Sequence, residues 1–214
     1  MGTFHRRVLT DLGFDVRTVD PAPGVADYQR VPRGRFDTVC ISVPIANLAE
    51  RAAEWVGHEG WLLVEKPFAE TTLRAAVLAE LLEGQRVAVG YVERFNPRVG
   101  DLRMLLESME PEHAVFRRWN DRPCRDVRLD LISHDVDLAR YLRLECSCVF
   151  DAGGDRPCRR RDVDVDGLHV DLLAHDTSPL HAMWRAFLDG QEGPAIPADA
   201  VAALRTLEGV PACA

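Results

Sequence analysis

Short apolar runs alternate with amphipathic segments along the first ninety residues. The apolar runs lie at residues 15–19, 38–43, 61–65 and 86–91, and segments with helical periodicity lie at 3–12, 47–57 and 70–83. In the first of these segments, four apolar side chains recur at the spacing of one helix face: Phe4, Val8, Leu9 and Leu12. Alternation of short strands with helices predicts a parallel sheet in a doubly wound α/β arrangement.

The pattern changes after residue 92. Helical periodicity recurs at 96–109, 130–142, 179–188 and 198–207, and strand-like stretches occur at 113–119 and in short pieces between 145 and 175. Within 130–142, four residues would bury one side of a long helix: Leu131, Val136, Leu138 and Leu142. We therefore predict an α/β protein of two domains. The first, over 1–91, is doubly wound, and the second, over 92–214, is a smaller α+β domain.

The composition limits the class of protein and the kinds of partner that the chain can have. The 214 residues are 47% hydrophobic and 28% charged, which is typical of a soluble globular protein. A net charge of −8 argues against a nucleic-acid surface and favours a small-molecule partner. The sequence contains neither a long apolar run nor a signal-peptide pattern, so we expect a cytoplasmic protein without a membrane partner. Its six cysteines include no C-x-x-C pair and no clustered histidines, which argues against a zinc site or a disulfide framework.

Lys66 is the only lysine among 26 basic residues. It follows the apolar run at 61–65, which places it at the carboxyl end of a parallel strand, where open α/β sheets bind their ligands. Arginine stays charged, whereas burial and neighbouring charges can adjust the proton affinity of a lysine amine. Lys66 is therefore a candidate proton donor or acceptor, and an exposed lysine without a function is the alternative. The turn at Pro67 could also contain a cis peptide bond.

Asp130 and His134 form a second candidate group. They are four residues apart and would share a helix face, where a carboxylate can orient an imidazole and raise its basicity. Asp135 and Asp137 fall on other faces. Ordinary pairing on a helix surface is the alternative for Asp130 and His134. Together with Lys66, however, they supply the groups needed to remove a proton from a hydroxyl while hydride leaves its carbon.

Three motifs occur in order along the chain: EKPFAET at 65–71, VGYVERFNPRV at 89–99 and DLISHDVDLARYL at 130–142. In combination they resemble the glucose-fructose oxidoreductase, inositol dehydrogenase and MocA family of NAD(P)-dependent oxidoreductases. The resemblance implies an N-terminal Rossmann domain and a second domain whose mixed sheet covers the nicotinamide and the substrate. It also implies NAD or NADP as cofactor, with sugars, cyclitols, nucleotide-activated sugars or related polyols as substrates.

The resemblance also implies roles for individual residues. Lys66 or His134 would relay the proton of the substrate hydroxyl, with Asp130 orienting the imidazole. Asp20, at the end of the second Rossmann strand, would accept hydrogen bonds from the adenosine ribose and favour NAD. A turn-forming aspartate before Pro21 is the alternative reading of Asp20.

Further positions carried over from the family fall on three segments and on the domain junction. The cofactor contacts are Gly2, Thr3 and Phe4 at the first helix, Ser42, Val43 and Pro44 beside the nicotinamide, and Glu65 and Pro67 around the lysine. Arg94 and Asn96 lie at the junction and would contact the substrate or the pyrophosphate. For Glu93 we favour an internal salt bridge that sets the junction.

Two departures from the family pattern change these expectations. Only Gly2 aligns with the glycines of G-x-G-x-x-G, so the first Rossmann strand and two phosphate-facing glycines would be missing. Few residues lie between Leu144 and Arg161, so the second sheet should be short, which would weaken the family's sheet-to-sheet contact in a possible homo-oligomer. Two hypotheses follow: a hydride-transferring oxidoreductase, or a reduced paralogue that binds no dinucleotide and serves as a partner subunit or a non-redox enzyme.

Overall fold

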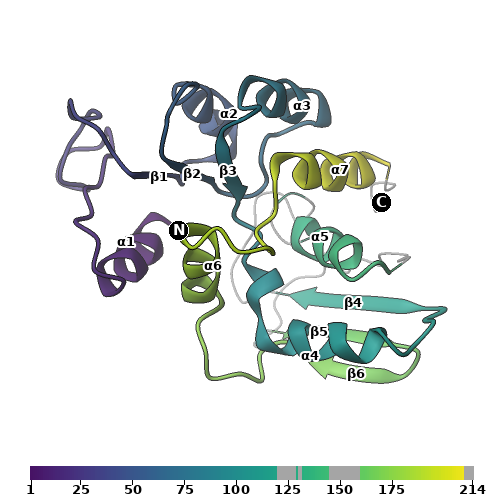
Figure 1. The fold of residues 1–214 in the computed structure, drawn as a ribbon. Helices are drawn as coiled ribbons and strands as arrows, with labels where there is room; N and C mark the ends of the chain where they lie inside the picture. Colours follow the sequence, from purple (N-terminus) through teal and green to yellow (C-terminus); the bar gives the residue numbers. More distant parts are fainter. Residues whose placement is uncertain (120–128, 130–131, 145–159, 210–214) are drawn as a thin grey trace.

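The computed structural model describes residues 1–119, 129, 132–144 and 160–209, which form two sheets surrounded by helices (Figure 1). The first elements along the chain are α1 (Gly2–Asp11), β1 (Thr38–Ile41), α2 (Ile45–Ala53), β2 (Trp61–Val64), α3 (Thr72–Leu81) and β3 (Arg86–Val89). They are followed by η1 (Val92–Phe95), α4 (Pro97–Leu106), β4 (Ala114–Trp119), α5 (Ser133–Tyr141), β5 (Arg160–Val165), β6 (Leu168–Asp171), α6 (Pro179–Leu188) and α7 (Pro197–Glu208).

The first sheet is parallel, with β2 between β1 and β3, and it confirms the predicted α/β class. Successive residues of a strand point to opposite faces. Leu62 and Val64 accordingly pack with α2, α3 and α7, whereas Leu63 packs with Ala88 of β3 and with α1 and α6. Figure 1 shows α2 and α3 above this sheet and α1 and α6 below it. The alternation of apolar residues in β2 thus produces a sheet that is covered on both faces.

The segment 15–19 does not form the predicted strand. Among the described residues its only ladder contact is an isolated parallel bridge between Val19 and Tyr28. The backbone and hydroxyl groups of Thr18 instead bond to Asp27 at 2.7–3.1 Å, so the segment satisfies its polar groups within its own loop. The apolar pattern of 15–19 is that of a strand, but a strand forms only where a neighbouring strand can pair with its backbone N–H and C=O groups.

The predicted apolar face of α1 is wrong at one position. Val8 and Leu9 are buried, but Phe4 is 55% exposed. His5 takes the buried place, with 2% of its surface exposed, because both ring nitrogens find hydrogen-bond partners in the interior. A hydropathy pattern cannot predict the burial of a polar residue whose hydrogen-bond partners lie elsewhere in the fold.

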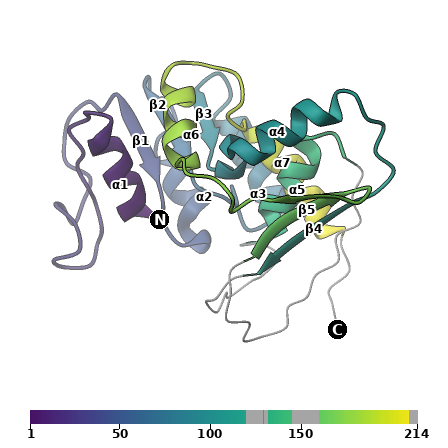
Figure 2. The ribbon, with the colours of Figure 1, turned by 90° about the horizontal axis from the view of Figure 1, so that it is seen from below.

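The second sheet consists, in the described ranges, of β4, β5 and β6 in antiparallel order. Val163 and Val165 of β5 face Leu138 and Leu142 across a core that also takes Leu102 of α4. Figure 2 shows α4 and α5 alongside this sheet. The described part of the helix predicted at 130–142 begins at residue 132. Leu138 and Leu142 of the predicted apolar side pack in this core, whereas Val136 packs in the core of the first sheet, and Leu131 lies outside the described residues.

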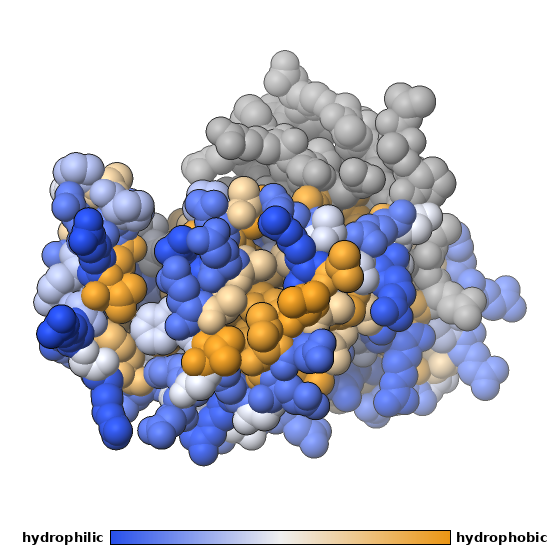
Figure 3. Space-filling model, turned by 90° about the horizontal axis from the view of Figure 1, so that it is seen from above, coloured by the Kyte–Doolittle hydropathy of each residue, from blue (hydrophilic) through white to orange (hydrophobic). Residues whose placement is uncertain are grey.

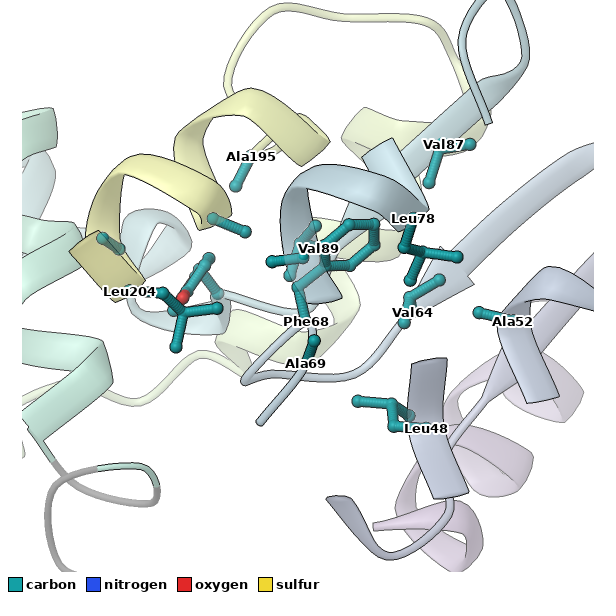
Figure 4. Packing of buried hydrophobic residues seen from close by; sticks show 14 of the residues in the cluster. Leu48, Ala52, Val64, Phe68, Ala69, Leu78, Val87, Val89, Ala195 and Leu204 are labelled. Carbon is teal, nitrogen blue, oxygen red and sulfur yellow. The ribbon is translucent and has the colours of Figure 1, made fainter. Parts of the chain in front are cut away.

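The two C-terminal helices pack on the first sheet, although the predicted boundary at 91/92 assigns them to the second domain. Trp184 of α6 joins Leu63 and Ala88 beneath the sheet. In Figure 4, Phe68 lies between Leu204 of α7 and Leu78 of α3, and all three belong to one buried cluster. Ala195, just before α7, also bonds through its carbonyl to the amide of Val89 at 2.8 Å. The chain therefore returns from the second sheet to complete the core around the first.

A buried group of charges joins the second sheet to η1 and α5. Arg118 donates to Asp135 at 2.8 and 2.9 Å and to Glu93 at 3.1 Å, and Arg161 donates to Glu93 at 2.5 Å. Burial raises the pKa of Asp135, against the opposing effect of Arg118. Burial would also raise the pKa of Glu93, but Arg118 and Arg161 outweigh it and lower that pKa. The internal salt bridge predicted for Glu93 is confirmed.

The outer surface of α3 is unusually apolar. Leu73, Val77 and Leu81 recur every fourth residue and are 75%, 50% and 49% exposed. Figure 3 shows apolar side chains gathered on the face that α2 and α3 form. Only the opposite side of α3, with Ala75 and Leu78, belongs to the described core.

Arg118 should be essential for stability, because without it the buried carboxylate of Asp135 would lose its compensating positive charge. We expect Arg118→Met to lower the free energy of unfolding by about 3–5 kcal/mol. The control is Arg74→Met, which removes an exposed pair with Glu70 at 2.6 Å and should cost less than about 1 kcal/mol. Urea unfolding at neutral pH measures both losses. Equal, small losses would contradict a stabilising role for the buried charges.

Candidate functional site at the carboxyl edge of the parallel sheet

The carboxyl ends of β1, β2 and β3 meet at one edge of the sheet, because the strands are parallel and in register. Residues that follow different strands are thereby brought together. A hollow of about 340 Å³ lies at this edge. Its lining consists of Met1, Ser42, Val43, Pro44, Glu65 and Lys66. Five of the six lining residues are positions for which the sequence predicted a catalytic or cofactor-binding role.

Lys66 enters the hollow from the turn after β2. The Lys66–Pro67 peptide bond is cis, as the sequence allowed. Phe68 and Ala69, both fully buried, fix the following residues in the core. Lys66 is partly buried and is one of the residues that line the hollow.

His134 lies in the first turn of α5 and is half-buried. Its pKa is well below the ordinary value, first because of burial and then because of the positive charges of Lys66, Arg118 and Arg161. The imidazole is therefore neutral near neutral pH. Its Nδ1 is buried without a hydrogen-bond partner among the described residues. His134 thus offers an uncharged ring within the electrostatic reach of Lys66. Asp130, the predicted orienting acid, lies outside the described residues.

Tyr91 is a further polar residue at this edge, and it was not among the residues predicted from the sequence. It follows β3, is 1% exposed, and its ring meets that of His134 edge to face with centroids 6.3 Å apart. Its hydroxyl has no hydrogen-bond partner in the described part of the chain. Burial, followed by the charge of Asp137, raises the pKa of this hydroxyl, so it stays protonated. A tyrosine at the end of an apolar run was the signal that could have identified it.

Glu65 lies in the floor of the hollow and is 5% exposed. His5 of α1 lies 2.7 Å from one carboxylate oxygen, and the amide of Lys66 donates to the other at 3.2 Å. Gly90 is close enough that an added Cβ would lie 2.9 Å from the carboxylate. This glycine is therefore required by the approach of Glu65. Glu65 was predicted as a cofactor contact, whereas His5 was not among the residues predicted from the sequence.

The cofactor contacts predicted at the start of α1 and at Asp20 have different surroundings. Gly2, Thr3 and Phe4 are exposed at the start of α1, directly after Met1 of the hollow. Asp20 accepts a hydrogen bond from the amide of Ala22 at 2.8 Å and does not line the hollow. This hydrogen bond is the one expected of the turn-forming alternative, and the role of Asp20 toward the adenosine ribose stays a prediction.

Arg94 and Asn96 are engaged within the protein. Arg94 donates to both carboxylate oxygens of Asp137, at 2.6 and 2.8 Å, and to Asp199 at 3.1 Å. Burial raises the pKa of Asp137 to about 6, although Arg94 opposes that effect. Asn96 donates to the carbonyl of Leu172 at 2.8 Å and caps α4. Both side chains connect elements around the junction, and neither lines the hollow.

The described residues include no group of three His, Cys, Asp or Glu side chains arranged to hold a metal ion. Within the same ranges, no helix has the length and apolar character needed to cross a membrane.

Comparisons with known proteins find similarity at the level of structure. No family model and no curated protein sequence matches the chain. The dehydrogenase WlbA from Thermus thermophilus, solved with NAD and UDP-GlcNAcA, has a TM-score of 0.74 and 19% identity over 95% of this chain and 88% of that one. GenD2 from gentamicin A biosynthesis, solved with NAD, has a TM-score of 0.79 and 20% identity over 98% and 90%.

A myo-inositol dehydrogenase from Corynebacterium glutamicum is similar with a TM-score of 0.68 and 15% identity, covering 89% of this chain and 85% of that one. Identities this low show the fold alone. The chain has the Rossmann-like fold of these dehydrogenases, which is the fold that its three motifs predicted.

Proposed function

We propose that this chain is an NAD(P)-dependent oxidoreductase that transfers a hydride to or from a secondary alcohol or ketone of a sugar, cyclitol or nucleotide-sugar substrate. The observation that carries the proposal is the hollow that brings Ser42, Val43, Pro44 and Lys66 together at the carboxyl edge of a parallel sheet. The fold supports it, because similar chains include dehydrogenases solved with NAD and, in one case, with a nucleotide sugar.

The lining of the hollow suits a nicotinamide group. Val43 and Pro44 offer apolar surface to a ring, and Ser42 offers a hydroxyl to a polar substituent. The start of α1 adjoins the same space, and the first amides of a helix favour an anion such as a pyrophosphate. We assign Gly2, Thr3 and Phe4 to that part of the cofactor, and Glu65 and Pro67 to the turn that shapes the floor. When bound, the cofactor would supply the hydride donor or acceptor.

The amine of Lys66 and the imidazole of His134 would handle the proton. An alcohol that gives up hydride must also release its hydroxyl proton to a base. A neutral His134 can accept that proton, whereas a charged Lys66 can donate a hydrogen bond to the oxygen or pass the proton on. The relay through Lys66 or His134, with Asp130 orienting the ring, is the proposed mechanism. Arg94 and Asn96 remain proposed contacts of the substrate or the pyrophosphate, beside the hydrogen bonds that they make within the protein.

Nucleotide binding is the first test. We expect NAD or NADP to produce a saturable change in the fluorescence of the four tryptophans. Val43→Asp places a charge in the apolar wall of the hollow and should weaken binding about tenfold or more. Val56→Asp is the matched control, because Val56 is 50% exposed and lies outside the lining. If neither nucleotide gave a saturable signal with the unmodified chain, the non-binding paralogue would replace the oxidoreductase as the better hypothesis.

Lys66→Arg tests the proton relay. The substitution keeps a positive charge but removes the compact, titratable head, so turnover should fall by about 100-fold or more while the melting temperature stays near its original value. Turnover is measured with NAD or NADP, using UDP-N-acetylglucosamine and myo-inositol as test alcohols. Nucleotide affinity serves as the control and should change little. Near-normal turnover in the variant would remove Lys66 from the mechanism.

Because His134 is neutral in the folded protein, the stability of the chain should depend on pH. Its folded pKa is depressed, so it contributes stability that is present above its unfolded pKa of about 6.5 and is lost as the pH falls through that value towards the folded pKa. We therefore expect His134→Gln, which cannot take up a proton, to lose less stability than the original chain between about pH 7 and pH 5. Urea unfolding at several pH values measures the difference. Parallel pH profiles would show that His134 is not held neutral by the fold.

A further inference from the structure

The outer side of α3 carries a continuous apolar ridge. Leu73, Val77 and Leu81 recur every fourth residue, with 75%, 50% and 49% of their surfaces exposed. Side chains at this spacing lie one above the other on a helix, so they form a single row inclined to its axis. In Figure 3 the apolar side chains of this face are bordered by hydrophilic ones. An exposed apolar surface with a polar border is typical of a site of protein association.

Packing within the chain does not account for this ridge. The side of α3 that belongs to the core consists of other residues, Ala75, Leu78 and Leu82, which are 0%, 2% and 2% exposed. A helix on the surface of a globular protein normally has one apolar side and a polar side opposite to it. Helix α3 has a second apolar side, and the reason for that side must lie outside the core of the chain.

One charge of each sign borders the ridge. Arg74 and Glu80 stand three residues before and three residues after Val77, and both are exposed. Three residues correspond to a rotation that ends about 60° from the starting direction, and the two positions lie on opposite sides of Val77. The ridge therefore has a positive border along one side and a negative border along the other.

Neither charge is placed where it would stabilise the helix on its own. Acidic side chains are favourable in the first turn of a helix and basic ones in the last turn. Helix α3 has no acidic residue in its first turn and no basic residue in its last turn. Arg74 donates to Glu70 at 2.6 Å, but an exposed pair of this kind contributes little and is easily exchanged for another. The helix dipole therefore does not explain the positions of the two charges.

We propose that the α3 ridge is the contact between two copies of this chain in a weak twofold dimer. A twofold axis along the ridge brings Arg74 of each copy next to the partner's Glu80, with the two Val77 side chains at the centre. A twofold axis across the ridge would instead bring the two Arg74 side chains together, and likewise the two Glu80 side chains. The charges therefore select the first arrangement. Rows of residues at this spacing pack with the helix axes crossing at about −50°, the commonest angle between helices.

A second copy fits the ridge better than a membrane surface does. Binding to anionic lipids favours a basic border around the apolar side chains, whereas this ridge has one border of each sign. The net charge of −8 also opposes such a surface. A second copy supplies an apolar ridge of the same length and both complementary charges at matching positions. The dimer contact is separate from the hollow and does not depend on the proposed function.

Sedimentation equilibrium of the full chain measures the association. Three exposed side chains per copy form a contact smaller than the roughly 800 Å² per partner of a stable interface, so concentrations up to about 1 mM are needed. We expect the average mass to rise from that of one chain towards that of two as the concentration increases. Val77→Glu places like charges at the twofold axis and should weaken association about tenfold or more. Met104→Glu is the matched control and should have no effect, because Met104 is 72% exposed on α4, outside the ridge.

Charge reversal tests the arrangement of the two copies. Arg74→Glu or Glu80→Arg alone brings like charges together on both sides of the ridge, so each variant should associate about tenfold more weakly or worse. When the two variants are mixed in equal amounts, each side again joins an acidic and a basic residue, and association should return. Both substitutions agree with the helix dipole, so the melting temperature of each variant should not fall.

Three outcomes would overturn the inference. The first is a chain that keeps the mass of a single copy at the highest concentration. The second is an association that Val77→Glu leaves unchanged, which would place the contact elsewhere. The third is a pair of charge variants that each associate as well as the original chain, because the proposed twofold axis requires both to be weakened. Circular dichroism confirms that every variant is folded, and neither nucleotide nor substrate enters the measurement.

Discussion

The parallel pairing of β2 with both of its neighbours is the constraint on which the rest of the structure depends. Because β1, β2 and β3 run in the same direction, the residues that follow them collect at one edge. That edge receives Pro44, Lys66 and Tyr91 from three separate parts of the chain. The sheet is stable because apolar residues of β2 point alternately to both faces, and helices cover each face.

Buried charges connect this sheet to the second one. Arg118 and Arg161 reach Glu93 from β4 and β5, while Arg94 joins η1 to α5 and α7. Such ion pairs stabilise little relative to apolar packing, but the loss of one partner is costly. They fix the position of α5, and with it the position of His134, relative to the turn that carries Lys66. The electrostatic effect of Lys66, Arg118 and Arg161 on His134 is a consequence of the same arrangement.

The local patterns predicted most of the elements, because strands and helices are specified by short-range apolar spacing. They failed where tertiary partners decide the outcome. The segment 15–19 has the composition of a strand, but the described chain places no strand beside it to form a ladder. His5 was overlooked because a polar residue on an apolar helix face is buried only when distant groups satisfy it, and those groups are Trp184 and Glu65. The motif also did not predict that Arg94 donates to Asp137 and Asp199, because those partners lie far from it in the sequence.

The sequence by itself determined the alternation of strands and helices, the place of Lys66 after a parallel strand, and the turn residues around it. These follow from local periodicity and from the chemistry of single side chains. Only the tertiary structure decided that α6 and α7 return to the first sheet, that Glu65 is bound by His5, and that the imidazole of His134 is neutral. Those features depend on contacts between residues far apart in the chain and on the removal of water from charged groups, which no local pattern encodes.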